Sequence, residues 1–441
     1  MSARFLTRES LRTLAQWEGS LLGALDGVIP SLSWSREELR AHQENKMRAL
    51  LQHAFGNVAL YKNKFAAASF HPEDFRTLDD LPRIPFLTKD DLRSTPLDEL
   101  VSARHRANAR LIASSGSTGV PSRLFRDESS LWHFTARNTA LYHDWCGEKP
   151  IANVLYFVDM AQDSIDYALA DLLRTTVMQN RIVSVHDSVK SQLEKLDEFT
   201  PEFISSYPST MRNLAIALHR RGEKNNALRL LHLTSETLDA GTRRLIEIVF
   251  PNARLIETYT CSEAGLVAFE CTKDKRLHIA EDGVIAEIIE GELAVTDLTN
   301  WSTPVIRYRG LGDRCRWDSS PCPCGSPLRS IRQLEGRVAD SIIRRDGTMI
   351  SPLVITNALD EITGVYQYQI VQREAGRFEI AVVKDETSEC EEASIRDEVA
   401  CVIERAVGEP SATLVNFVAA IHPKTGAHKI PLVISFANVT S

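Results

Sequence analysis

Short apolar runs alternate with helical segments through the middle of this 441-residue chain, and this alternation constrains its fold more than any other feature. The runs at 152–158, 202–208 and 230–237 are short, rich in strand-forming residues and bounded by turns. Segments with helical spacing lie near them, at 164–173, 210–221 and 240–250. This order predicts an α/β fold in which a parallel-rich sheet is covered by helices on both faces. Because ligands in such folds gather at the carboxyl ends of strands, the polar turns after these runs are the candidate site.

The chain is too long for one ordinary domain, and its 43% of hydrophobic residues can fill more than one core. Within 367–418 the pattern changes to alternating strands around one helix at 391–407. We therefore expect a large N-terminal domain over residues 1–336 and a small α+β C-terminal domain over residues 337–441.

Charge and hydropathy exclude several classes of protein. The net charge is −8 and lysines and arginines do not cluster, which argues against a nucleic-acid partner. No segment has the length of a membrane span, and residues 1–19 lack the apolar core of a secretory signal. The eight cysteines are dispersed, which suits a reducing compartment better than a disulfide scaffold. These features predict a cytoplasmic protein without a membrane partner.

A loop rich in glycine and hydroxyl groups, I-A-S-S-G-S-T-G-V-P at 112–121, follows a short strand pattern. Its backbone N–H groups and hydroxyls could wrap a phosphate. It differs from a Walker loop because Val120 and Pro121, and no lysine, follow the second glycine. On the loop alone, a polar surface turn explains the sequence equally well. The residues concerned are Ser114, Ser115, Gly116, Ser117, Thr118 and Gly119.

Two later strand patterns also end in polar turns. The first turn contains Ser235, Glu236 and Thr237, and the second strand and turn contain Glu257, Tyr259, Thr260, Ser262 and Glu263. Magnesium held on a triphosphate is usually bound by one or two carboxylates together with phosphate oxygens, and Glu263 can supply one such carboxylate. Taken alone, however, a solvated loop carboxylate is the simpler interpretation of Glu263.

Four soft or borderline ligands form a candidate zinc set. Cys271 and His278 are seven positions apart, and Cys322 and Cys324 lie in a later Cys-Pro-Cys-Gly segment. Three thiolates and one imidazole suit tetrahedral zinc, although the spacing is not that of a standard zinc finger. Buried thiols and a core histidine are the alternative.

Six motifs, in order, resemble those of the phenylacetate-CoA ligase family of adenylate-forming enzymes. The loop S-S-G-S-T-G-x-P resembles that family's phosphate-binding loop, which likewise lacks the lysine. The segments T-S-E at 234–236 and Y-T-C-S-E at 259–263 resemble its adenine and magnesium motifs. The remaining matches are G-E-L-A-V-T at 291–296, P-V-I-R-Y-R-G-L-G-D at 304–313 and G-R-V-A-D at 336–340.

The resemblance implies an adenylate-forming fold and the ATP-dependent activation of a small carboxylic acid, aromatic or heteroaromatic, with Mg²⁺ and transfer to coenzyme A. It implies that the three turns bind ATP, that Asp313 holds the ribose hydroxyls, that Arg337 also contacts the nucleotide, and that Lys429 on a mobile C-terminal domain is catalytic. It also implies that zinc in the cysteine and histidine set is structural, because all four ligands come from protein. A homodimer is compatible with the resemblance.

The chain departs from the family pattern at three places that bear on function. Ala339 replaces the first aspartate of the hinge motif, His428 precedes Lys429 where the family has glycine, and the segment 345–352 only partly matches the family's R-G-x-N-V-F-P. Thr260 also replaces a family glycine. These departures leave two alternatives open. The chain could adenylate an acid and pass it to a carrier protein or an amine, or it could be a zinc-stabilised nucleotide-binding protein without catalysis.

Overall fold

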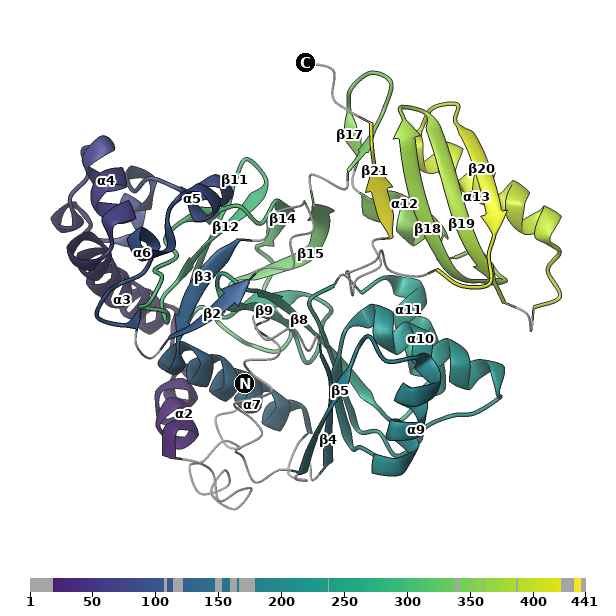
Figure 1. The fold of residues 1–441 in the computed structure, drawn as a ribbon, viewed down its shortest axis with the longest axis horizontal. Coiled ribbons are helices and arrows are strands. Elements are labelled where there is room, and N and C mark those ends of the chain that lie inside the picture. The colour runs from purple at the N-terminus through teal and green to yellow at the C-terminus, as the bar shows by residue number, and fades with distance from the viewer. Residues whose placement is uncertain are drawn as a thin grey trace.

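The computed structural model describes residues 19–106, 109–113, 122–146, 153–158, 165, 179–236, 238–337, 341–350, 352–359, 361–385, 388–421 and 432–437. Its elements form a large N-terminal body and a separate C-terminal lobe (Figure 1). No helix in these ranges is both long and apolar enough to cross a membrane.

A group of helices opens the described chain: α2 (Gly19–Ser31), α3 (Arg36–Asn57), α4 (Ala59–Ala67), α5 (Lys89–Ser94) and α6 (Leu97–Leu100). The start of α3 is fixed by a capping box, in which the Ser35 side chain accepts from the Glu38 N–H and the Glu38 carboxylate accepts from the Ser35 N–H. One face of α3 buries Leu39, Met47, Leu50 and Leu51. This helix is therefore amphipathic, and its apolar face packs into the main core.

The main sheet has 13 strands. Its order is β1-β13-β12-β14-β15-β10-β9-β8-β7-β6-β4-β5, and β11 pairs with β12. The strands are β1 (Leu87–Thr88), β4 (Asn153–Val158), β5 (Gln179–Ser184), β6 (Phe203–Ser206), β7 (Leu230–Thr234), β8 (Arg254–Cys261), β9 (Gly265–Glu270), β10 (Leu277–Ile279), β11 (Val284–Ile289), β12 (Glu292–Asp297), β13 (Tyr308–Arg309), β14 (Asp313–Asp318) and β15 (Ser330–Arg337). A separate hairpin joins β2 (Ala109–Ala113) to β3 (Arg123–Asp127).

The half of this sheet that runs from β5 to β8 is parallel and is covered on both faces, as predicted. Helix α7 (Glu128–Cys146) lies on one face, and α9 (Val189–Phe199), α10 (Pro208–Arg220) and α11 (Ala240–Val249) lie on the other (Figure 1). Successive residues of β4 enter different cores, because Val154 and Tyr156 pack with α7 whereas Leu155 and Phe157 pack with α9 and α10. A strand that is buried on both faces in this way has a continuous apolar sequence.

The C-terminal lobe has its own core. Its sheet has the order β20-β19-β18-β21, with β18 (Val365–Glu374), β19 (Arg377–Lys384), β20 (Ala412–Phe417) and β21 (Val433–Ser435). Helices α12 (Pro352–Leu359) and α13 (Glu392–Val407) bury apolar side chains against it, and a short hairpin joins β16 (Ile342–Ile343) to β17 (Met349–Ile350). This is the small α+β unit that the sequence predicts, although the boundary at 336/337 stays a prediction.

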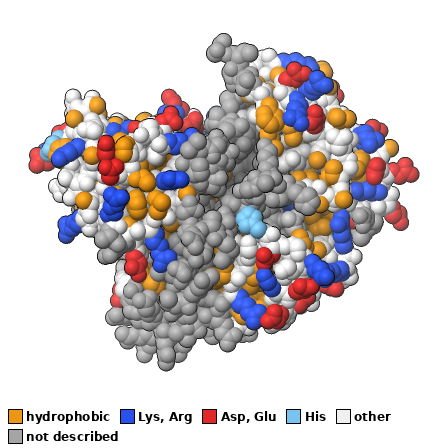
Figure 2. Space-filling model, in the orientation of Figure 1, with side chains coloured by type: hydrophobic (Ala, Val, Ile, Leu, Met, Phe, Trp, Pro, Cys, Tyr) orange, Lys and Arg blue, Asp and Glu red, His pale blue; other side chains and the backbone are white. Residues whose placement is uncertain are grey.

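The lobe meets the N-terminal body at α10. The ring of Tyr366 on β18 lies edge-on to His219, with centroids 6.0 Å apart, and the Arg220 guanidinium lies 5.4 Å from its centroid. Acidic and basic side chains are interspersed over the described part of the face in Figure 2, and no continuous basic area is seen there. The predicted helix at 164–173 falls almost wholly outside the described residues.

Candidate functional site

The carboxyl ends of β7 and β8 bring two of the predicted polar turns together. These strands are parallel neighbours, so Thr234 pairs with Thr258 in register. Just beyond this pair, the hydroxyls of Thr234 and Thr260 lie 2.9 Å apart. The turns that follow therefore start from the same edge of the sheet, where ligands of parallel sheets bind.

The first turn contains a residue in the left-handed conformation and is held by a side-chain contact with the N-terminus of a helix. Ser235 has φ of +69°, a left-handed conformation that is uncommon outside glycine. The Glu236 carboxylate accepts from the Ser209 N–H at 2.9 Å and from the Ser209 hydroxyl at 3.0 Å, at the N-terminus of α10. A carboxylate suits a helix N-terminus because orphan N–H groups point at it. The Glu236 side chain thus fixes the turn, and a nucleotide contact by Ser235 or Glu236 stays a prediction.

Glu263 is buried in the second turn, at 6% exposure. Its Oε1 accepts from the Tyr308 hydroxyl at 3.1 Å. Among the described residues, no basic side chain forms an ion pair with this carboxylate. A buried carboxylate normally has a charged partner or binds a metal, so this position is suited to a cation.

The backbone around Glu263 is anchored by Arg126, which is 1% exposed. Its Nη1 donates to the carbonyl oxygens of Ser262 and Glu263 at 3.1 and 3.2 Å, and its Nη2 donates to Asp297 at 2.8 Å. The buried charge of Arg126 is therefore balanced by Asp297, and its Nη1 holds the turn. The sequence reveals only an arginine at the end of a strand pattern, so this role was missed.

Tyr259 and Asp313 are brought together from distant parts of the chain. The Tyr259 hydroxyl donates to Asp313 Oδ2 at 2.5 Å. Asp313 follows Gly312, whose φ of +72° needs glycine, and it pairs with Arg337 across β14 and β15. The structure thus places three of the predicted nucleotide contacts in one region, as the first residue of β14, the last of β15 and a residue of β8.

Glu257 faces a different set of charges from the other predicted residues of β8. Its carboxylate lies 3.8 Å from Arg243 Nη2, and Glu270 accepts from the same Nη2 at 3.0 Å. Burial raises the pKa of Glu257 to about 7, the nearby Glu270 carboxylate adds to the rise, and Arg243 opposes it. A nucleotide contact by Glu257 stays a prediction.

We expect Glu257→Gln to stabilise the protein relative to wild type at pH 8 but not at pH 5. A carboxyl whose pKa rises from 4.5 to about 7 on folding contributes stability at low pH, and that contribution is lost as pH rises through 7. Thermal melts of both proteins without nucleotide, at several pH values, measure the difference. An equal difference in Tm at pH 5 and pH 8 would contradict this assignment.

His232 lies on β7, two residues before Thr234, and the sequence does not predict a role for it. Its Nδ1 lies 2.8 Å from the Ser205 hydroxyl and 3.0 Å from the Tyr142 hydroxyl, and its Nε2 lies 2.7 Å from Thr258 Oγ1. Burial lowers the pKa of His232 to about 3, so the ring is neutral. A lone histidine in an apolar run gives no signal of such a network.

The predicted zinc ligands come together. The ligand atoms of Cys271, His278, Cys322 and Cys324 all lie within 4.8 Å of one another. Backbone N–H groups of Lys273 and Ser326 donate to the sulfurs of Cys271 and Cys324 at 3.3 and 3.4 Å. Gly325 turns the chain with φ of +75°. Donors aimed at sulfur stabilise thiolates, so the chemistry of this set fits a tetrahedral zinc ion.

Several predicted residues lie outside the described residues: Ser114, Ser115, Gly116, Ser117, Thr118, Gly119, Thr237, Ala339 and Lys429. Their roles stay predictions.

Comparison with known proteins identifies relatives of the chain, although no model of a known protein family matches it. It is 31% identical over 347 residues to a phenylacetate-coenzyme A ligase of Pseudomonas putida, covering 74% of this chain and 76% of the relative. It is 30% identical over 378 residues to the ligase of the same name from Thermus thermophilus, covering 78% of this chain and 81% of that relative.

Solved structures share the fold at lower identity. A 2-hydroxyisobutyryl-CoA ligase in the postadenylation state superposes with a TM-score of 0.78 at 18% identity, covering 91% of this chain and 90% of that one. The same ligase in the thioesterification state superposes with a TM-score of 0.61 at 19% identity, covering 92% of this chain and 91% of that one. The anthranilate CoA ligase AuaEII superposes with a TM-score of 0.53 at 13% identity, covering 96% of this chain and 97% of that one. Because this chain is 31% and 30% identical to these two ligases and covers 76% and 81% of their lengths, it belongs to the phenylacetate-CoA ligase family of adenylate-forming enzymes.

Proposed function

We propose that this protein activates a carboxylic acid with ATP and transfers the acyl group to coenzyme A. In the first half-reaction a carboxylate oxygen attacks the α-phosphate of ATP, which gives an acyl-adenylate and releases pyrophosphate. In the second, the thiol of coenzyme A attacks the acyl carbon and AMP leaves. The observation that carries the proposal is the hydrogen bond between Tyr259 and Asp313, with the buried Glu263 in the turn after β8, in a chain whose relatives are CoA ligases.

The described residues support a division of labour at this site. The hydrogen-bonded pair of Tyr259 and Asp313 would present carboxylate oxygen to a ribose, and the turn that follows β7 would contact the base. Glu263 would hold Mg²⁺, which supplies charge neutralisation on the phosphates when bound. Because Arg126 and Tyr308 hold the turn of Glu263 and the Glu236–Ser209 contact holds the other turn, catalysis would come from positioning and preorganised charge.

An aromatic acid is the substrate class we propose. On the α7 face below the polar turns, the rings of Tyr142 and Phe203 lie 4.7 Å apart, and those of Tyr156 and Phe203 lie 6.3 Å apart. Phe203 and Tyr156 are buried core side chains, 1% and 8% exposed, so the proposed substrate class depends on the relatives and not on these rings. The names of the phenylacetate and anthranilate ligases are consistent with this class.

ATP–pyrophosphate exchange across a panel of aryl and short-chain acids tests the proposal. We expect exchange with aryl acids at a higher kcat/KM than with short-chain acids, and thioester formation on addition of coenzyme A. Exchange without a thioester would favour a carrier protein or an amine as the acceptor. The absence of exchange with every acid would favour a nucleotide-binding protein without catalysis.

We also propose that the C-terminal lobe, beginning near residue 337, moves between the two half-reactions. The higher TM-score against the postadenylation state than against the thioesterification state supports an arrangement of the lobe that resembles the former. The contact of Tyr366 with His219 and Arg220 would have to break for the lobe to turn. Such motions are a common rate-limiting step in enzymes of this kind.

We propose one structural zinc per chain, held by Cys271, His278, Cys322 and Cys324. Its removal should lower the melting temperature, because the binding energy of a structural metal is folding energy. Cys324→Ser should lose zinc and stability together, whereas Cys390→Ser, a half-buried cysteine outside the set, should keep the metal. Metal analysis by mass spectrometry and melts with and without a chelator provide the measurement. A zinc-free protein with an unchanged melt after chelation would rule the site out.

A further inference from the structure

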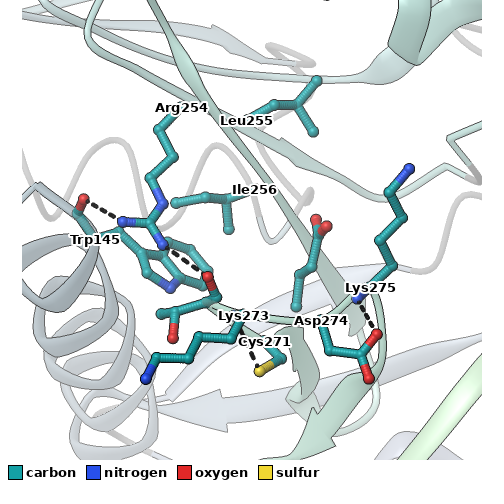
Figure 3. A pocket seen from close by; sticks show the side chains of 10 residues that line it. Trp145, Arg254, Leu255, Ile256, Cys271, Lys273, Asp274 and Lys275 are labelled. Carbon is teal, nitrogen blue, oxygen red and sulfur yellow. Dashed lines mark hydrogen bonds between the residues drawn. The ribbon is translucent and has the colours of Figure 1, made fainter. Parts of the chain in front are cut away.

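A pocket lies at the opposite end of β8 from the polar turns. Its volume is about 360 Å³, and it is bounded by the start of β8, the C-terminal end of α7 and the loop after β9 (Figure 3). The eight residues of β8 separate it from the turn that carries Glu263 by roughly 23 Å, at about 3.3 Å per residue. The pocket is therefore distinct from the proposed nucleotide site.

The lining of the pocket combines cations with an apolar wall. Arg254, Lys273 and Lys275 contribute three positive charges, and Trp145, Leu255 and Ile256 contribute the apolar surface. In Figure 3 the two lysine side chains extend in opposite directions from the loop, and Arg254 lies beside the Trp145 indole. This concentration of positive charge occurs in a protein whose net charge is −8.

Each of the two acidic side chains that line the pocket forms an ion pair with an arginine outside the lining. Asp274 forms an ion pair with Arg276 at 2.7 Å, and Glu270 forms one with Arg243 at 3.0 Å. Among the described residues, no carboxylate forms an ion pair with Arg254, Lys273 or Lys275. The positive charge of the pocket is thus left for a ligand or for solvent.

Hydrogen bonds orient the Arg254 side chain and hold the loop that carries the two lysines. Arg254 donates to the carbonyl oxygens of Trp145 and Thr272, at 3.1 and 3.2 Å, two neutral acceptors that orient its guanidinium without cancelling the charge. In the loop, Asp274 accepts from the Lys275 N–H at 2.7 Å, and Arg276 donates to the Ser320 carbonyl at 2.7 Å. An oriented guanidinium loses less entropy on binding an anion than a free one does.

We propose that this pocket binds a small organic phosphate that carries at least two negative charges. Guanidinium and ammonium groups recognise phosphate oxygens through charge-assisted hydrogen bonds. The apolar wall and the volume, at the lower end of ligand pockets, leave room for an organic part beyond the phosphates. The site is independent of the proposed reaction, and an occupant would act as an effector at a distance.

Calorimetric titration of the full chain with fructose 1,6-bisphosphate tests the proposal, because this probe carries two phosphates and has no adenine for the nucleotide site. We expect one site per chain, weakened at least about tenfold in Lys273→Gln/Lys275→Gln and in Arg254→Gln, since each change removes a charge-assisted contact. The double variant Lys62→Gln/Lys224→Gln removes the same charge from exposed positions elsewhere and should bind as wild type does.

One further variant and one further ligand test the location of the site and the role of the organic part. Asp313→Asn should leave binding unchanged, because Asp313 belongs to the other end of β8. Inorganic phosphate should bind more weakly than the bisphosphate, and equal affinity would contradict a role for the organic part. No binding by wild type, or equal weakening in the Lys62/Lys224 control, would overturn the proposal. Melts of all variants establish that they fold, and none of these outcomes depends on adenylation activity.

Discussion

The Glu263→Gln variant should lose ATP–pyrophosphate exchange by about 10²-fold or more while keeping its fold, because removing one preorganised electrostatic contact usually costs that much. The substitution is nearly isosteric, and the Tyr308 hydroxyl can still donate to the amide oxygen as it does to Glu263 Oε1 at 3.1 Å. What disappears is the negative charge, and with it a ligand for Mg²⁺. The defect should shrink as Mg²⁺ is raised if the variant still binds the ion weakly.

Tyr308→Phe is the matched control for Glu263→Gln. It removes the hydrogen bond to Glu263 but keeps the charge, so exchange should fall by much less and the Mg²⁺ dependence should shift little. Tyr308 is fully buried, and a melt of each variant is needed to separate lost packing from lost chemistry. Exchange by Glu263→Gln at the wild-type rate, at both limiting and saturating Mg²⁺, would show that Glu263 is not the magnesium ligand.

The sequence was sufficient to predict the parallel half of the sheet. Val154 and Leu155 belong to different cores, and a strand with two buried faces has to be apolar throughout. The sequence does not predict the antiparallel half, because the residues from Glu257 to Glu263 indicate only one strand followed by a polar turn. The hairpin between β8 and β9 depends on Gly265, whose φ is +69°. A glycine at this position is compatible with a hairpin but does not require one.

The candidate site was predictable where it depends on neighbouring strands. Thr234 and Thr260 meet because consecutive parallel strands place their carboxyl ends side by side. Contacts that depend on the wider sheet could be expected only from the family resemblance, which groups Asp313 with Tyr259 although 54 residues separate them. The helix cap made by Glu236 could not be predicted at all, because nothing in the sequence relates it to Ser209 on the preceding helix.

Arg126 shows the limit of reading charge from sequence. It follows the glycine- and hydroxyl-rich loop closely, but the sequence does not decide whether its side chain reaches a phosphate bound there. In the structure it is buried, balanced by Asp297 and used to hold the turn of Glu263. A buried arginine that is already paired gains little by turning to a phosphate and would leave Asp297 uncompensated. The loop residues Ser114 to Gly119 supply no full positive charge of their own, so another cation is needed.

Lys429→Ala should slow acyl-adenylate formation by ~10²–10³-fold, because Lys429 is the cation we propose for the phosphates. Charge would develop on the α-phosphate and on the departing pyrophosphate, and Mg²⁺ held by Glu263 would neutralise only part of it. A lysine carried by the C-terminal lobe would reach the phosphates when the lobe closes, which couples exclusion of water to the chemical step. Single-turnover formation of the acyl-adenylate measures the effect.

Two comparisons separate this role from that of an ordinary surface lysine, the usual state of lysines near a chain end. Given preformed acyl-adenylate, Lys429→Ala should transfer the acyl group to coenzyme A at nearly the wild-type rate, because the pyrophosphate has already left. Lys424→Ala removes the same charge five positions earlier and should form the adenylate normally. A large loss in Lys424→Ala with a normal Lys429→Ala would move the catalytic role to Lys424, and normal rates in both would show that neither lysine supplies the cation.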